Sequence, residues 1–128
     1  MSSKWEAFEL DEKVRSILNN VTPSSPGHHL GMPYLTAYQI AIEFNRRHPE
    51  IVGELGYKVG GKAVGEHVSL SQYMARQLSQ RIKAGKLTDI EGGFLSRQDL
   101  GDMVFSTGIE SSADGSWDAS IYRIKGSV

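Results

Sequence analysis

The stretch from Val68 to Gly85, VSLSQYMARQLSQRIKAG, constrains the fold of this chain most, because it encodes both ends of a helix. The Ser69 hydroxyl can cap the first turn, and the Gln72 side chain three residues later can bond back to the Ser69 N–H. Gly85 suits the left-handed residue that commonly ends such a helix. The pattern therefore predicts a helix over 69–84.

This predicted helix has one apolar side and one polar side. At about 100° per residue, the two kinds of side chain separate onto opposite faces. The apolar face consists of Leu70, Met74, Leu78 and Ile82. The polar face consists of Gln72, Arg76, Ser79, Gln80 and Lys83. We expect the first face to pack on a core and the second to be available to a partner.

A second helix is predicted by the same kind of signal. Thr36 and Gln39 have the spacing of a capping box, and apolar side chains follow at helical intervals. This helix should stop before Pro49, because proline disfavours a helical residue ahead of it. Pro49 can itself start another turn, so we expect a short helix over 50–55 that ends at Gly56.

The first 21 residues carry apolar side chains with helical rather than alternating spacing. These side chains are Trp5, Phe8, Leu10, Val14, Ile17, Leu18 and Val21. We expect one amphipathic helix within 1–21, from about residue 4 to about residue 20. Its apolar face either packs within the monomer, which is the commoner case, or pairs with a second copy to form a homodimer. Residues 22–33, with three prolines and two glycines, are expected to form a loop.

Two segments nearer the C-terminus favour strands. Residues 87–95 and 119–125 contain β-branched and aromatic side chains of the kind that strands prefer. An antiparallel pair of these segments would form a small β element after the helices.

The segment between these strands supports two interpretations. A third capping box, at Ser96 and Asp99, favours a helix over 97–106. A later Asp-Gly turn signal instead favours a strand over 103–109 that pairs with the last strand. The sequence alone leaves both open.

Positive charge is concentrated around the helix over 69–84. Residues 57–88 contain six basic side chains and one acidic one, whereas 1–56 and 89–128 carry net charges of −2 and −4. Outside the helix, the basic residues of this segment are Lys58, Lys62 and Lys86. Such a segment is typical of a surface that contacts phosphates, although the same charges also solvate an exposed helix.

Several kinds of chemistry find no support in the sequence. There is no cysteine, the four histidines lack metal-ligand spacing, and no Gly-x-Ser-x-Gly motif marks a nucleophile. The glycine-rich stretch 56–62 is similar to a phosphate-binding loop, but Ala63 stands where magnesium would need a hydroxyl. We therefore expect no enzyme activity, no cofactor and no metal.

Length and hydropathy favour one soluble domain. The chain has 128 residues, near the commonest domain size, with 39% hydrophobic and 23% charged residues. No apolar run approaches the roughly 20 residues that cross a bilayer, and no signal peptide is recognisable at the start. We expect a cytoplasmic protein without membrane contact.

The segment GGKAVGEHVSLSQYMARQLSQRI, followed by a glycine and two β-like segments, resembles the latter part of a winged helix-turn-helix domain. In that family a short helix, a tight turn and a recognition helix precede a β-hairpin wing. The resemblance implies a short helix at 62–66, a recognition helix at 69–84 and a winged-helix-like core over 34–125. The implied fold class is a mainly α single domain over 1–128 with a small antiparallel β element.

Two features of the sequence depart from that family. The glycines within and beside the implied short helix, Gly60, Gly61 and Gly65, weaken an element that has to brace the recognition helix. The implied wing falls in the acidic segment 89–128, although a wing that meets phosphates should be basic.

The function that these features favour is non-enzymatic binding of duplex DNA by a regulator. Arg76 and Gln72 would contact base edges from the polar face, which also carries Ser79 and Gln80. The residues expected on phosphates are Lys83, Lys86, Lys62 and Lys58. A homodimer through the first helix would supply two half-sites. The alternative is a small protein-binding adaptor or inhibitor, immunity- or antitoxin-like, that uses its acidic C-terminal surface.

Overall fold

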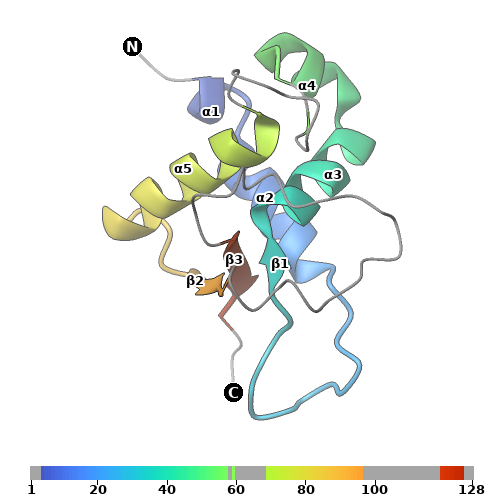
Figure 1. Ribbon diagram of the computed structural model, residues 1–128, viewed down its shortest axis with the longest axis vertical. Coiled ribbons are helices and arrows are strands. Elements are labelled where there is room, and N and C mark those ends of the chain that lie inside the picture. Colours follow the sequence, from blue (N-terminus) through green and yellow to red (C-terminus); the bar gives the residue numbers. More distant parts are fainter. Residues whose placement is uncertain (1–3, 58, 60–68, 97–118, 126–128) are drawn as a thin grey trace.

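The computed structural model describes residues 4–57, 59, 69–96 and 119–125. Its elements are α1 (Lys4–Ala7), α2 (Leu10–Asn19), β1 (Leu35–Thr36), α3 (Ala37–Arg47), α4 (Pro49–Leu55), α5 (Leu70–Lys83), β2 (Ile90–Leu95) and β3 (Ala119–Ile124). The fold is mostly helical with a small antiparallel sheet, so the predicted fold class is confirmed (Figure 1). The predicted segments 62–66, 97–106 and 103–109 lie outside the described residues.

The sheet has three strands in the order β1-β3-β2, and Figure 1 shows β3 in the middle. Both pairings are antiparallel, and Tyr122 on β3 lies opposite Leu35 on β1 and Gly92 on β2. The missing side chain of Gly92 makes room for the Tyr122 ring, because a Cβ there would lie 3.1 Å from it. The predicted pair of strands is thus confirmed, although β2 begins at Ile90 rather than at residue 87. Strand β1 is an addition that the sequence did not reveal.

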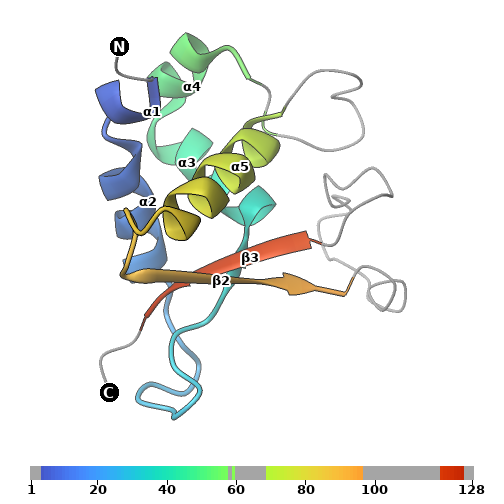
Figure 2. The same cartoon turned by 90° about the vertical axis from the view of Figure 1, so that its left-hand side faces the viewer.

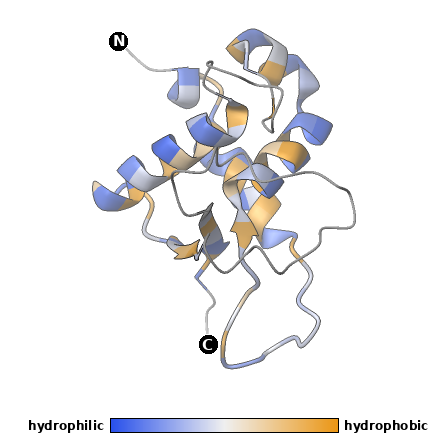
Figure 3. Cartoon of the chain, viewed as in Figure 1, coloured by the Kyte–Doolittle hydropathy of each residue, from blue (hydrophilic) through white to orange (hydrophobic). Residues whose placement is uncertain are grey.

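The helices pack together on one face of the sheet (Figure 2). Figure 3 shows the hydrophobic residues of α3 and β1 gathered towards the middle of the molecule. The largest core side chains, all fully buried, are Trp5, Leu10, Ile17, Leu18, Ile40, Phe44, Leu70, Met74, Leu78, Leu87 and Ile90. They come from the helices, from β2 and from the turn before it, so one shared core unites these elements.

Two of the predicted helix boundaries, the start of α3 and the end of α4, are confirmed by the local geometry. Before α3, the Gln39 N–H donates to Thr36 Oγ1 at 3.0 Å, and the Thr36 N–H donates to Gln39 Oε1 at 2.8 Å. After α4, Gly56 has a φ of 79°, which is the left-handed conformation expected of a glycine that ends a helix. The capping signals in the sequence therefore act locally, as predicted.

The expected continuous helix over residues 4–20 is wrong, because the chain breaks between α1 and α2. Glu9 adopts a left-handed conformation, with φ 55° and ψ 46°. On an unbroken helix Trp5 would point roughly 140° away from Leu10. The break brings both side chains into the same core, where each has no exposed surface.

The apolar side chains of α1 and α2 pack within the monomer. Trp5, Leu10 and Val14 have no exposed surface, and the positions on α2 that face outward, Glu12, Ser16 and Asn19, are polar. A homodimer through this helix would depend on the same apolar side chains. The sequence allowed this apolar face either to pack within the monomer or to pair with a second copy, and in the structure it packs within the monomer.

Glu43 in α3 provides a pH-dependent contribution to stability. Hydrogen bonds from Arg46 and then Arg47 lower the pKa of Glu43 from its ordinary 4.5 to about 2. A carboxylate with a lowered pKa stabilises the fold above its unfolded pKa, and this contribution is lost as the pH falls through the folded value. Because the group is partly exposed, solvent screening reduces the contribution to about 1 kcal/mol.

The expected result is that the free energy of unfolding falls more steeply between pH 5 and pH 2 in the natural protein than in Glu43→Gln. Urea titrations at several pH values would measure the difference, expected to be about 1 kcal/mol across that interval. An equal loss in both proteins would contradict the assignment of this contribution to Glu43.

Candidate nucleic-acid interface

α5 is a two-sided surface helix, as its sequence predicts. Leu70, Met74 and Leu78 have no exposed surface, and Ile82 is partly buried against the same core. The predicted polar set is exposed along the whole helix, namely Gln72, Arg76, Ser79, Gln80 and Lys83. One face of α5 packs on α3 and the sheet, and the other is open to solvent.

The position of α5 is set by contacts at its start and its middle. Ser69 Oγ accepts from the Gln72 N–H at 3.1 Å, which confirms the predicted cap. The Tyr122 hydroxyl donates to the carbonyl of Ala75 at 3.2 Å and thereby joins the buried side of α5 to β3. At the other end Gly85 has a φ of 76° and turns the chain towards β2. The contacts at its start and on its buried side thus hold α5 in place, and its other face stays exposed.

The cap engages part of the Gln72 side chain. Its Oε1 accepts from the Ser69 N–H at 2.9 Å. Paired recognition of adenine by glutamine uses both the side-chain oxygen and the side-chain amide. While the cap is formed, only the side-chain NH2 group of Gln72 is free to bond to a base. Gln80, one turn after Arg76, has no side-chain hydrogen bond within the described residues and has both groups available.

The basic side chains of the described ranges fall into two groups. The first group donates to a carboxylate or a backbone carbonyl, or forms an ion pair with a carboxylate, and comprises Lys4, Lys13, Arg15, Arg46, Arg47, Arg81 and Arg123. The second group has no such acceptor within those ranges and comprises Arg76, Lys83, Lys86 and Lys125. All four members of the second group are exposed, and three of them lie on α5 or in the turn that follows it.

Arg81 belongs to α5 but contributes to the fold rather than to the exposed face. Its guanidinium lies 3.5 Å from Glu6 Oε1 and 5.5 Å from the centre of the Trp5 ring, and its side chain is only 10% exposed. Its Nε also donates to Gln77 Oε1 at 3.3 Å. Arg81 is therefore one of the six basic residues of segment 57–88 whose charge is not available to a partner.

The remaining residues of the predicted site are placed only in part. Lys86 is exposed in the turn between α5 and β2. Lys58 and Lys62 lie outside the described residues, as does the short helix implied at 62–66. The described helix that packs most closely on α5 is α3.

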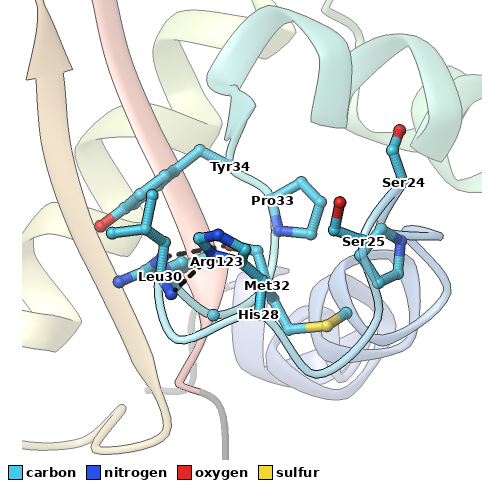
Figure 4. Close-up of a pocket in the computed structure, with 10 residues that line it drawn as sticks. Ser24, Ser25, His28, Leu30, Met32, Pro33, Tyr34 and Arg123 are labelled. Atoms are coloured by element: carbon cyan, nitrogen blue, oxygen red, sulfur yellow. Dashed lines mark hydrogen bonds between the residues drawn. The ribbon is translucent and has the colours of Figure 1, made fainter.

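A pocket of about 620 Å³ lies apart from α5, inside the loop between α2 and β1. Figure 4 shows the guanidinium of Arg123, from β3, among the residues of this loop. Arg123 Nη1 donates to the carbonyls of Leu30 and Met32, and its guanidinium lies 4.4 Å from the centre of the Tyr34 ring. Its Nε bonds to Glu91 on β2. Arg123 thus ties the loop to the sheet, and its charge is already paired.

Two kinds of feature are absent from the ranges that the structure describes. No helix there is long and apolar enough to cross a membrane. No group of three or more histidine, aspartate or glutamate side chains there is arranged to hold a metal ion.

No family model, curated protein or solved structure matches this chain. The element order and the strand order β1-β3-β2 are compatible with the winged-helix arrangement that the sequence resembles.

Proposed function

We propose that this protein is a non-enzymatic regulator that binds duplex DNA through the exposed face of α5. The observation that carries the proposal is the distribution of unpaired positive charge. Within the described residues, the cations without an acceptor are concentrated on this helix and at its end, whereas the others are paired with acceptors of the protein itself. Cations that contact phosphates release the counterions condensed on the DNA, which supplies a large share of the affinity of such proteins for DNA.

The residue types on this face suit the two kinds of contact that DNA requires. Arg76 can bond to both O6 and N7 of guanine, and Gln80 can make the equivalent pair to adenine. Ser79, between them, can bond to any base or to a phosphate. Lys83 and Lys86 suit phosphates, and on sequence alone Lys58 and Lys62 join them.

The dimensions of α5 suit a major groove. A helix of 14 residues is about 21 Å long, and the groove is about 12 Å wide and admits one helix. With Arg76 and Gln80 near its middle, a helix inclined across the groove would set these two over base edges. Lys83, near the C-terminal end, would then lie over the phosphates at one side.

The proposal is tested by the salt dependence of binding to short labelled duplexes, measured by fluorescence anisotropy. The expected affinity falls about a hundredfold between 50 and 200 mM salt, as for about four phosphate contacts. Arg46→Gln is the matched control and should keep the salt dependence of the natural protein. Arg46 is an exposed cation of α3, but its charge is paired with Glu43. Absence of binding at 50 mM salt would contradict the proposal.

An adaptor or inhibitor that docks on a protein is the second candidate. The observation that favours it is Phe94 on β2, whose side chain is 73% exposed. Most acidic residues of the segment 89–128 lie within 97–118, outside the described residues. Recovery of a stoichiometric protein partner that is lost on Asp114→Lys with Asp118→Lys, together with no binding to duplex DNA, would favour this candidate instead. A cytoplasmic location suits both candidates and stays a prediction.

A further inference from the structure

Strand β2 forms a free edge of the sheet. Among the described strands only β3 pairs with it, and Figure 2 shows β2 in front of β3 with no further strand in front of it. The strand at the other edge, β1, has two residues, whereas β2 has six. On β2 both Gly92 and Phe94 are exposed, and the exposed fraction of Phe94 is 73%. The longer of the two sheet edges is therefore open to a partner.

The backbone groups of β2 point alternately towards β3 and away from it. The Lys125 N–H donates to the carbonyl of Asp89 at 2.8 Å, and these two residues lie opposite each other where the β2–β3 ladder begins. Directly opposed residues that share a hydrogen bond have their backbone groups turned towards each other. By the alternation, Glu91 and Gly93 also bond towards β3.

The backbone groups of Gly92 and Phe94 consequently point to the free edge. Neither residue has a hydrogen bond outside the strand pairing with β3 in the part of the chain that the structure describes. Two N–H groups and two carbonyls, in an extended conformation and spaced along one line, are thus left without a partner. Such a row is a template on which another extended chain can pair.

The edge lacks the features that usually keep free strand edges apart. Its sequence, IEGGFL, contains neither lysine nor proline, and its six consecutive pairs with β3 are not interrupted by a bulge. Its one charged side chain, that of Glu91, is paired with Arg123 on β3. The edge therefore has no unbalanced charge that would repel an identical edge.

A second copy of β2 fits these groups. When two copies run antiparallel about a two-fold axis at Gly93, Gly92 of one copy lies opposite Phe94 of the other, and each such pair exchanges both N–H···O bonds. Every free group of the edge is then used. The Phe94 ring lies beside a glycine, so no side chain competes for its place. Glu91 lies opposite Leu95 of the other copy, so like charges do not oppose each other.

We infer that β2 is a homodimer interface, at which the free edges of two copies pair antiparallel about Gly93 and join their sheets. A strand of six residues buries far less than the roughly 800 Å² per partner of a stable complex, so the dimer dissociates in the micromolar range, at about 10–100 μM. The apolar side chains of α1 and α2 are buried within the monomer and leave this role to β2.

The inference does not depend on the proposed function. A dimer through β2 can form whether or not α5 binds DNA. If both hold, the dimer carries two copies of α5 and thus supplies the two half-sites usual for such regulators.

Sedimentation equilibrium of the full chain, from about 5 μM to about 500 μM, tests the interface. The mass of the natural protein is expected to rise from 14.1 kDa towards twice that value. Phe94→Lys places a charge on the edge and should weaken the dimer at least about tenfold. Leu30→Lys is the matched control, because Leu30 is 67% exposed in the loop before β1, and it should dimerise like the natural protein.

A second pair of variants tests the backbone bonds themselves. Phe94→Pro removes an N–H that points to the free edge and leaves every bond to β3 in place, so it should prevent dimerisation while circular dichroism shows an unchanged fold. Phe94→Leu keeps this N–H and an apolar side chain and should keep most of the dimer. A dimer that withstands both Phe94→Lys and Phe94→Pro would lie elsewhere and would overturn the inference.

Amide hydrogen exchange of the natural protein, followed by NMR, gives a test that needs no variant. The amides of Gly92 and Phe94 should exchange freely at low concentration and become protected as the concentration rises. The amides of Glu91 and Gly93, which bond to β3, should be protected throughout. The inference is wrong if the natural protein stays monomeric at every concentration, or if the exchange of Gly92 and Phe94 does not change when it dimerises.

Discussion

Trp5→Ala is expected to lower the free energy of unfolding by about 3–5 kcal/mol, the usual cost of truncating a buried tryptophan. Trp5 has no exposed surface, and its Nε1 donates to Asp11 Oδ1 at 2.6 Å. Its ring packs edge-on against Tyr73, with the ring centres 5.7 Å apart, and contacts the Arg81 guanidinium. The substitution removes an aromatic contact between α1 and α5 and leaves Arg81 without its aromatic neighbour.

Urea unfolding followed by far-ultraviolet circular dichroism would measure this loss. Phe94→Ala is the matched control, because it truncates an aromatic side chain that is 73% exposed, and a change within about 0.5 kcal/mol is expected. Trp5→Phe keeps a ring in the core and should lose less than Trp5→Ala. A loss below about 1 kcal/mol for Trp5→Ala would show that α1 is not part of the cooperative core.

Arg76→Ala is expected to abolish the sequence preference of DNA binding, with a loss of about 1–3 kcal/mol on the preferred duplex. The reason is that a paired arginine contact distinguishes guanine from the other bases, whereas a lysine on a phosphate does not distinguish sequences. Lys83→Ala should therefore weaken binding to all duplexes by a similar factor. The two variants remove one exposed cation each from the same helix, so they are matched in charge and in location.

Selection from a randomised duplex pool, followed by affinities for the selected and a scrambled sequence, would measure the preference. The ratio of these affinities is expected to fall towards one in Arg76→Ala and to stay unchanged in Lys83→Ala. The assignment of Arg76 to a base edge would be wrong if its variant kept the ratio. Gln80→Ala is expected to reduce the ratio more than Gln72→Ala, because the oxygen of Gln72 is engaged in the cap.

The parts of the fold that the sequence predicted correctly depend on neighbours within a few residues. The capping boxes at Thr36 and Ser69 each join a side chain to a backbone group three residues away. Gly56 and Gly85 end helices because a residue without Cβ adopts a positive φ at little cost. Each of these features depends only on residues within one helical turn, so the local sequence determines it.

The errors arose where a distant contact outweighed the local pattern. Apolar spacing favoured one helix across Glu9, but burial of Trp5 together with Leu10 requires the chain to turn there. Strand β1 is only two residues long and exists through its pairing with β3, more than 80 residues later. Neither a local propensity nor a local charge pattern contains that information.

The candidate interface also has features that the sequence determines and features that only the tertiary structure determines. The sequence by itself determined that α5 is a capped helix with an exposed polar face carrying Arg76, Gln80 and Lys83, because helical periodicity separates the two faces. Only the tertiary structure decided which charges remain available. It buries Arg81 against Trp5 and Glu6 and balances Asp89 with Arg15. Charge pairing depends on distances between elements, and folding alone sets those distances.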